Sequence, residues 1–345
     1  MSRWMLALGV WIVGVVQAAP EQVPLYREIK DWVVACDNLR GCQALSAPES
    51  FGYTPFSLLL ERAAGGQAPL RLSLYDAKQS GYAPLRLDGR GLSTADRLHP
   101  TEKQGETTLV AEGADALAVL AELRNGTHLS MEGVCEYEAV VSLNGLSAAL
   151  LLMDAVQGRL DSRSALYRPG SRPDSEVSAA PRAPHLRAYP GAPSLSEMEQ
   201  RDIVQQTMAA TRSQWLEEDM SREPEAQAFA LNDHEALVII RTSCAAYNCD
   251  FAVYRVDREP PYVERDLRLE APPLELGVLS GAVSYNPDTG ELGYLYKGRG
   301  IADCGDSGSW RFDGERFQLA SLSFLGRCAG RSPGEWPELW RVVEP

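Results

Sequence analysis

The sequence predicts an α+β fold in two domains: a mixed α/β N-terminal domain and a β-rich C-terminal domain built from disulfide-clipped hairpins. Three observations predict this class. At 345 residues the chain is long enough for two domains. Residues 168–193 are rich in proline, alanine and serine and lack apolar periodicity, which is typical of an extended linker. Helical and strand periodicities mix before this stretch, whereas after it a single helix is followed by strand patterns.

Residues 1–18 have the layout of a secretory signal peptide. Arg3 gives a short positive start, an apolar run extends from Trp4 to Val16, and the small residues Val16 and Ala18 suit a cleavage site. A membrane anchor is the alternative, but the run is shorter than the roughly 20 residues that cross a bilayer. We therefore expect cleavage after Ala18, a periplasmic or secreted protein, and no stable membrane insertion afterwards.

Residues 19–167 form the predicted N-terminal domain. One strand enters a tight loop between two cysteines, and further short runs have strand character. A first helix pattern stops at Asn125 and Gly126, and a second shows one apolar face and closes at Gly158. The expected strands are 28–36, 56–62, 69–76 and 134–143, and the expected helices are 114–124 and 146–157.

Residues 194–345 form the predicted C-terminal domain, which opens with a helix at 196–217. Turn sequences between apolar runs then predict hairpins, most clearly at Asp313 and Gly314. The expected hairpins pair 237–243 with 251–257, 283–285 with 294–296, and 310–312 with 316–319.

All seven cysteines follow the signal, and in an exported chain their short spacings predict disulfides. The sequence leaves the connectivity open. Proximity favours the pairs Cys36–Cys42 and Cys244–Cys249. Elimination and hairpin geometry favour the pair Cys304–Cys328. Cys135 is then unpaired. It is either a reactive or intermolecular thiol or, as we favour, a small buried apolar residue in a strand.

The formal net charge of −14 predicts an acidic surface, which disfavours nucleic acid and anionic lipid as partners. No metal site is expected, because there is no C-x-x-C pair and none of the four histidines stands at ligand spacing to a cysteine or another histidine. No cofactor is expected either, since the sequence has no phosphate-binding loop.

Ser307 lies in a GDSG segment preceded by a cysteine, like the nucleophile of trypsin-like proteases. That chemistry also needs a histidine base, an aspartate that orients it, and amides for the oxyanion. None of the four histidines has the sequence context of that fold, and His234 beside Asp233 is the pair we would assign as the base. A glycine-rich turn anchored by a disulfide explains the segment equally well. The favoured expectation is no catalytic residue, with Ser307 as the alternative.

Four tryptophans of the C-terminal domain allow two interpretations. An exposed platform for a sugar or peptide is one, but such residues more often belong to the core. The four are Trp215, Trp310, Trp336 and Trp340.

Four segments carry a resemblance to a known family: DWVVACDNLRGCQA (31–44), SLNGLSAALLLMDAVQGR (142–159), GRGIADCGDSGSWRFDGERFQL (298–319) and PGEWPELWR (333–341). Together they resemble domain-of-unknown-function family number 1176, an uncharacterised family of bacterial envelope proteins, over nearly the whole mature chain. The resemblance implies export and a disulfide framework, and it implies no activity, cofactor or catalytic residue. The opening segment also resembles the start of the invasion-associated locus B proteins, which are small and secreted.

The favoured function is therefore a non-enzymatic envelope protein that binds a protein or a cell-wall component on a rigid, disulfide-stapled surface. One concrete version is an inhibitor of a cell-wall lytic enzyme, because an acidic surface complements the basic lysozymes. The alternatives are a serine hydrolase that uses Ser307 and a redox-active protein that uses the Cys135 thiol.

Overall fold

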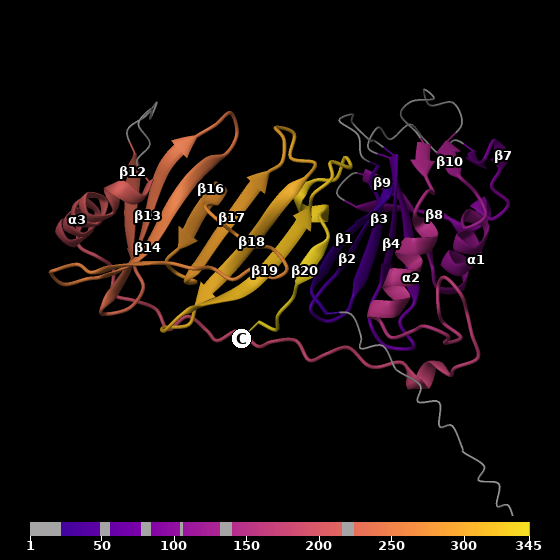
Figure 1. Cartoon of the computed structure of the whole chain (residues 1–345), viewed down its shortest axis with the longest axis horizontal. Helices are drawn as coiled ribbons and strands as arrows, with labels where there is room; N and C mark the ends of the chain where they lie inside the picture. Colours follow the sequence, from indigo (N-terminus) through magenta and orange to yellow (C-terminus); the bar gives the residue numbers. More distant parts are fainter. Residues whose placement is uncertain are drawn as a thin grey trace, which may run out of the picture.

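The computed structural model describes residues 22–48, 56–76, 84–103, 106–131, 140–215 and 224–344. The fold is α+β, as predicted, and its strands gather in two large sheets that lie side by side along the long axis (Figure 1). The predicted signal peptide and Cys135 lie outside the described residues. None of the helices in the described part of the chain combines the length and the hydropathy needed to span a membrane.

The N-terminal sheet has seven antiparallel strands. In spatial order they are β1 (Leu25–Ile29), β2 (Trp32–Cys36), β3 (Cys42–Ser46), β4 (Phe56–Arg62), β5 (Leu70–Asp76), β9 (Glu106–Glu112) and β8 (His99–Lys103). The predicted strands at 56–62 and 69–76 are present as β4 and β5. The single strand expected at 28–36 is wrong. It is two strands, because Lys30 adopts a left-handed conformation (φ 51°) and turns the chain from β1 into β2.

A second sheet of four strands and two helices complete this half. The strands are β11 (Val140–Ser142), β10 (His128–Met131), β6 (Leu85–Leu87) and β7 (Arg90–Gly91), and the helices are α1 (Gly113–Leu123) and α2 (Leu146–Val156). Both helices lie where the sequence predicts them. α1 packs on β5 and β9 and α2 on β2 and β3, so one apolar core fills the space between helices and sheet.

Gly145 allows α2 to begin close to the β1–β2 turn. Its φ is 105°, and a Cβ there would lie 2.5 Å from the Ile29 carbonyl oxygen, so only glycine fits. Just before it, the Ser142 hydroxyl donates to the Asp31 carboxylate at 2.6 Å, and Trp32 Nε1 donates to the Ser142 carbonyl at 3.2 Å. These contacts fix the start of α2 on the sheet.

The C-terminal sheet has nine strands, and each predicted hairpin is present. In order they are β12 (Glu225–Ala230), β13 (Glu235–Cys244), β14 (Cys249–Asp257), β16 (Leu279–Asn286), β17 (Glu291–Lys297), β18 (Gly305–Phe312), β19 (Phe317–Leu325) and β20 (Glu338–Trp340), with β15 (Glu264–Asp266) beside β14. α3 (Glu197–Trp215), close to the expected 196–217, packs on β12, β13 and β14. A core around Trp310 lies on the other face.

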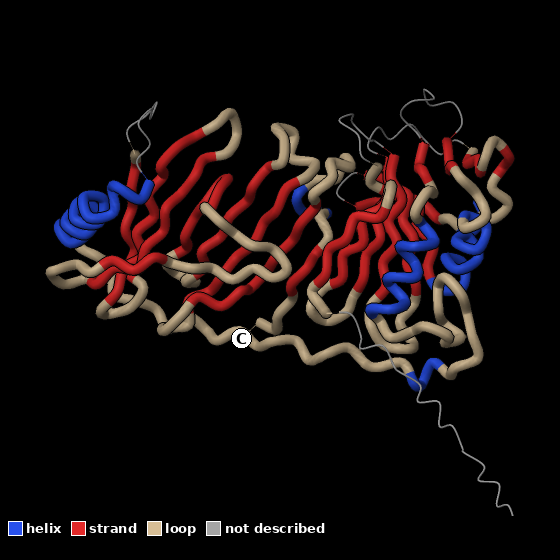
Figure 2. The backbone as a smooth tube through the Cα atoms, viewed as in Figure 1, coloured by secondary structure: helices blue, strands red, loops and turns tan. Residues whose placement is uncertain are grey.

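The stretch predicted as a linker, 168–193, contains no strand, only single bridges and the 3-10 turn η2 (Asp174–Glu176). Figure 2 shows it as a long loop that runs along one side of both sheets. Two more 3-10 turns are η1 (Ala95–Arg97) and η3 (Pro333–Glu335). The boundaries of the two domains stay a prediction.

The two sheets share a small core where they meet. Val33 and Leu45 of the N-terminal sheet pack in one cluster with Leu325 and Trp336 of the C-terminal half. Val33 is buried there, while its neighbours Trp32 and Val34 belong to the core under the helices. β2 is therefore buried on both faces, which explains its run of apolar residues.

Glu199 ties down the first turn of α3. Its carboxylate accepts from the Ser196 amide (2.8 Å) and hydroxyl (2.7 Å) and pairs with Arg258 at 3.1 Å. These hydrogen bonds lower the pKa of Glu199 from 4.5 to about 2. Because the folded pKa lies below the unfolded value, the stabilisation is present above about pH 4.5 and is lost as the pH falls towards 2.

We expect Glu199→Gln to flatten the fall in thermal stability between about pH 5 and pH 2, because the ionisation that drives it is gone. Melting temperatures measured across this range check the prediction. Glu197→Gln, which removes an exposed carboxylate from the same turn, is the control and should keep the wild-type slope. Identical slopes in all three proteins would contradict the assignment.

Candidate binding cleft

Ser307 lies in the middle of β18, opposite Leu295 of β17 and Ser323 of β19, so its segment is a paired strand. The histidines lie elsewhere: His99 and His128 in N-terminal strands, His185 in the predicted linker and His234 just before β13. Within the described residues no hydrogen bond joins a histidine to Ser307, and the backbone amide of His234 donates to Asn232 Oδ1. The described residues thus bring no base to this serine.

We expect a fluorophosphonate probe to leave the folded, oxidised protein unlabelled, because Ser307 has no partner in the described residues that would take its proton. Gel fluorescence of the wild type beside Ser307→Ala checks this. Labelling that disappears in Ser307→Ala would show a serine hydrolase.

The described cysteines form the disulfides Cys36–Cys42, Cys244–Cys249 and Cys304–Cys328. Proximity favours the first two pairs, and elimination with hairpin geometry favours the third. Asp303 joins the third pair in a group whose ligand atoms lie within 4.8 Å of one another, as in a metal site. Both sulfurs are bonded to each other, however, and the Asp303 carboxylate accepts from Arg299 Nε at 2.6 Å and from the Gly330 amide at 3.2 Å. The group therefore fastens the loop before β18 to the loop after β19.

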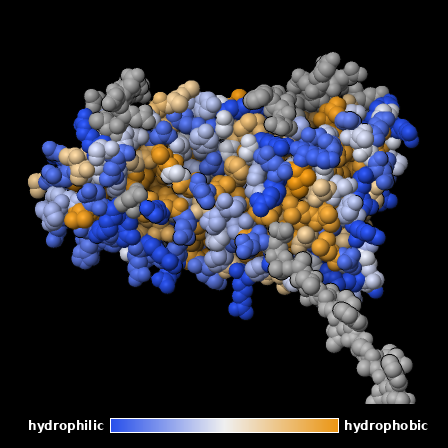
Figure 3. Space-filling model, viewed as in Figure 1, coloured by the Kyte–Doolittle hydropathy of each residue, from blue (hydrophilic) through white to orange (hydrophobic). Residues whose placement is uncertain are grey.

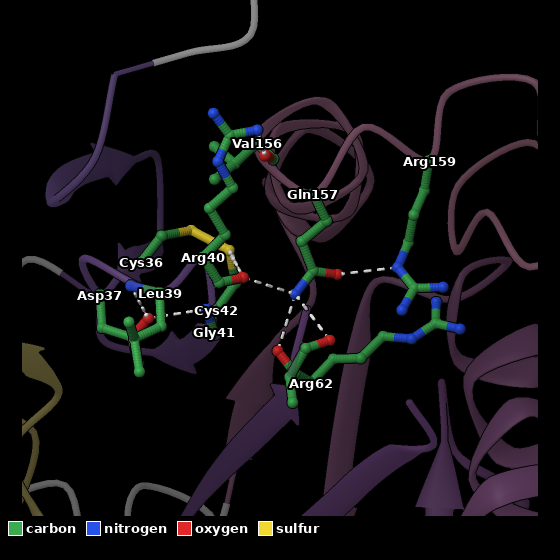
Figure 4. The surroundings of a disulfide bond; sticks show 11 residues. Cys36, Asp37, Leu39, Arg40, Gly41, Cys42, Arg62, Val156, Gln157 and Arg159 are labelled. Carbon is green, nitrogen blue, oxygen red and sulfur yellow. Dashed lines mark hydrogen bonds between the residues drawn. A yellow bond between two sulfur atoms is a disulfide. The ribbon is translucent and has the colours of Figure 1, made fainter. Parts of the chain in front are cut away.

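A buried polar network holds the end of α2 beside the first disulfide (Figure 4). Gln157 Nε2 donates to the carbonyls of Arg40 at 3.0 Å and Arg62 at 2.7 Å, and its Oε1 accepts from Arg159 Nε at 3.1 Å. Burial lowers the pKa of Arg62 to about 10 and also lowers the pKa of Arg159. The network links the loop between β2 and β3, the end of β4 and the end of α2.

Arg159 and Asp154 extend this network into the chain that follows α2. Arg159 is fully buried and donates to Ser164 Oγ at 2.8 Å and to the Gly65 carbonyl. The Asp154 carboxylate accepts the amides of Leu166 and of the next residue, both at 2.9 Å. Burial raises the pKa of Asp154. These two charged groups are thus engaged within the protein, so their role is structural.

Two of the four segments that carry the family resemblance, residues 31–44 and 333–341, meet where the two sheets join. The Asp37 carboxylate accepts the amides of Leu39 (2.9 Å) and Gly41 (2.7 Å) and pairs with Arg341 at 2.8 Å. Asn38 exchanges two hydrogen bonds with the Arg341 backbone, at 2.9 and 2.8 Å. These residues shape the fold, and a site for a partner must be sought elsewhere.

A cleft of about 1150 Å³ opens in the C-terminal half, where β15 and β16 pair with different ends of β14. β16 pairs with residues 249–251 and β15 with residues 254–256, so Ala252 and Val253 stand between them. The intervening chain, residues 267–278, leaves the sheet, crosses it and forms one wall of the cleft (Figure 1).

Apolar side chains make up much of the lining: Trp215, Phe251, Val253, Tyr254, Leu267, Leu269, Leu274, Leu276 and Val278. Two of the aromatic residues are held by hydrogen bonds inside the protein. The Tyr254 hydroxyl donates to Gln214 Oε1 at 3.0 Å, and Trp215 Nε1 donates to Thr211 Oγ1 at 2.9 Å. The walls are thus pre-formed, as in most binding sites.

Charged and polar groups surround this apolar lining. The Asp250 carboxylate accepts the hydroxyls of Ser243, at 2.9 Å, and Ser280. Glu270 and Glu275 stand exposed on the crossing segment, as does Arg268. The cleft is thus apolar with a few polar groups at its edge, which is the usual composition of a binding site.

The sequence indicated only part of this cleft. Of the four tryptophans, Trp310 and Trp336 belong to the core, with 1% and 4% of their surface exposed, and Trp215 lines the cleft. The crossing segment is not among the elements predicted from the sequence. Its signal was the pair of alternating leucine motifs on either side of Pro272 and Pro273, which predicts an extended segment with one apolar face.

Comparisons with known proteins point to a single family. The family model described as "Protein of unknown function (DUF1176)" matches residues 26–343. The chain is 30% identical over 346 residues to the uncharacterized protein YpfG of Escherichia coli (strain K12), which covers 95% of this chain and 94% of the relative. No solved structure shows significant similarity to the present chain.

Proposed function

Since the chain belongs to the DUF1176 family of proteins of unknown function, we propose from its structure that it is a non-enzymatic envelope protein that binds another macromolecule in the cleft of its C-terminal half. The cleft carries this proposal. It is a large concave site in the β-rich half, and its lining combines apolar side chains with a few charged groups. The three disulfides support work outside the cytoplasm, where such bonds persist.

A finer version of the proposal is an inhibitor of a cell-wall lytic enzyme. The net charge of −14 supports it, because an acidic protein attracts basic lysozymes over long distances. Titration calorimetry of the mature chain against one basic lysozyme of each structural class, at low and high salt, tests this version. No binding at low salt would end it and would leave the general proposal in place.

Photo-crosslinking tests the general proposal. Benzoylphenylalanine replaces Val278, which lines the cleft and is 66% exposed, and in a matched control it replaces Ile301, which is 64% exposed and lies outside the cleft. Both variants are expressed in the envelope of a bacterium that makes the protein and are then irradiated. We expect a discrete adduct from the Val278 variant alone. Adducts from the control alone, or from neither variant, would overturn the cleft as the binding site.

The two alternatives from the sequence keep their own tests. The hydrolase is tested by the fluorophosphonate experiment on Ser307. The thiol protein is tested by the rate at which Cys135 reacts with iodoacetamide near neutral pH, because a functional thiol is exposed and has a low pKa. The likeness of the opening segment to the invasion-associated locus B proteins stays a prediction and agrees with an exported binding protein.

A further inference from the structure

If the cleft binds a partner, as proposed above, its volume indicates how large that partner is. Sites for small molecules enclose roughly 300–1,000 Å³. At about 1150 Å³ this cleft lies just above that range and has room for several residues of a polymer. A segment of a macromolecule therefore fits it, and the two classes to compare are a polypeptide and a glycan.

Carboxylates outnumber cations around the cleft. Asp250, Glu270 and Glu275 line it together with one guanidinium, that of Arg268. In the described part of the chain none of these carboxylates forms an ion pair, whereas acidic side chains on β13 and at the end of β14 pair with arginines. A cationic partner would supply the missing countercharges and would be steered towards the cleft.

The cleft also leaves apolar surface uncovered. Val278 is 66% exposed, Pro272 and Pro273 are exposed, and Leu274 and Leu276 are only partly buried. Figure 3 shows hydrophobic surface on the C-terminal half bordered by hydrophilic side chains. Apolar surface with a polar rim is typical of a site for another macromolecule.

The polar groups inside the cleft favour a polypeptide over a glycan. A sugar needs free hydrogen-bonding groups for its hydroxyls, since burying them unpaired is costly. Apart from the exposed charges of the crossing segment, the Tyr254 hydroxyl is engaged by Gln214, the Trp215 N–H by Thr211, and the Asp250 carboxylate by two serine hydroxyls. Apolar side chains of a polypeptide fit this lining without such a cost.

We propose that the cleft binds a cationic polypeptide segment. An apolar side chain of that segment lies on the surface formed by the crossing segment and Phe251, and lysine or arginine side chains lie beside Glu270 and Glu275. The partner is thus a basic protein with an exposed extended or helical stretch in which apolar and cationic residues are close together.

Fluorescence anisotropy with three defined probes tests this inference. The probes are a labelled peptide of alternating lysine and leucine, its glutamate and leucine counterpart, and labelled chitotetraose. We expect the lysine peptide to bind, more weakly as salt rises, and the other two to stay free. The double variant Glu270→Gln with Glu275→Gln should bind the lysine peptide about five- to tenfold more weakly.

The matched control is Asp288→Asn with Glu315→Gln, which removes the same number of exposed carboxylates outside the cleft and should leave the affinity unchanged. Equal weakening in both double variants would overturn the inference, because only overall charge would then matter. Binding of chitotetraose alone would make the occupant a glycan. In that case the Val278 crosslink would still form, so the inference and the proposed function fail separately.

Discussion

Arg159→Leu is expected to lower the free energy of unfolding by about 3–5 kcal/mol, because it removes one member of a buried charged network. Arg159 is fully buried and donates to Gln157, Ser164 and the Gly65 carbonyl. Leucine would leave Gln157 Oε1 without its donor and would remove the bonds to Ser164 and Gly65, and Asp154 would lose a nearby positive charge. Urea denaturation followed by tryptophan fluorescence measures the change.

Arg163→Leu is the control for this experiment, because Arg163 lies four residues away and its side chain is exposed. We expect it to change stability by no more than about 0.5 kcal/mol. If the two variants had the same denaturation midpoint, the network would contribute nothing beyond the packing of its apolar carbons. A loss confined to Arg159→Leu would show that the QGR sequence after α2 is needed to hold the chain from 159 to 177.

The elements that the sequence predicts well are those whose cause is local. The β13–β14 hairpin is set by a short loop between Cys244 and Cys249, and the β18–β19 hairpin by Asp313 and Gly314. α2 carries its own apolar face and ends before Gly158, whose φ is 65°. In each case neighbouring residues supply both the stabilising contact and the turn, so a window of ten to twenty residues, roughly, contains the whole signal.

What the sequence did not predict depends on contacts between distant residues. Asp37 reads as an ordinary turn residue, yet its carboxylate is buried against Arg341, about three hundred positions along the chain. Arg159 follows a helix-ending glycine and reads as a solvated residue, yet it is fully buried. The cleft arises because β15 and β16 share β14 and leave a gap, and strand order of this kind is not visible in periodicity.

The same limit applies to the contact between the two sheets. The segment after β19 inserts two arginines into the N-terminal half. Arg327 Nε pairs with Glu28 at 2.8 Å, and Arg331 Nε donates to Ser57 Oγ at 3.1 Å while its guanidinium lies 4.4 Å from the Tyr75 ring. Both arginines flank Cys328, so the disulfide to Cys304 fixes the segment that joins the halves.

Removing this disulfide is therefore expected to uncouple the two halves. For the double variant Cys304→Ser with Cys328→Ser we expect a loss of about 3.5 kcal/mol from the closed loop alone. The freed segment would also lose the ordered positions of Arg327 and Arg331, which cross to the other sheet. Differential scanning calorimetry should show one transition for the wild type, because the sheets share a core, and two for the variant.

The double variant Cys244→Ser with Cys249→Ser separates loss of a disulfide from loss of the junction. That bond closes a shorter loop at the tip of the β13–β14 hairpin, so we expect a cost of about 2 kcal/mol and a single transition. Two transitions in this variant as well, or one transition in both, would show that coupling does not depend on the segment around Cys328. Two transitions in the Cys304→Ser, Cys328→Ser variant and one in the other variant would instead mean that the Cys304–Cys328 disulfide holds the C-terminal half, and with it the cleft, rigidly against the N-terminal sheet.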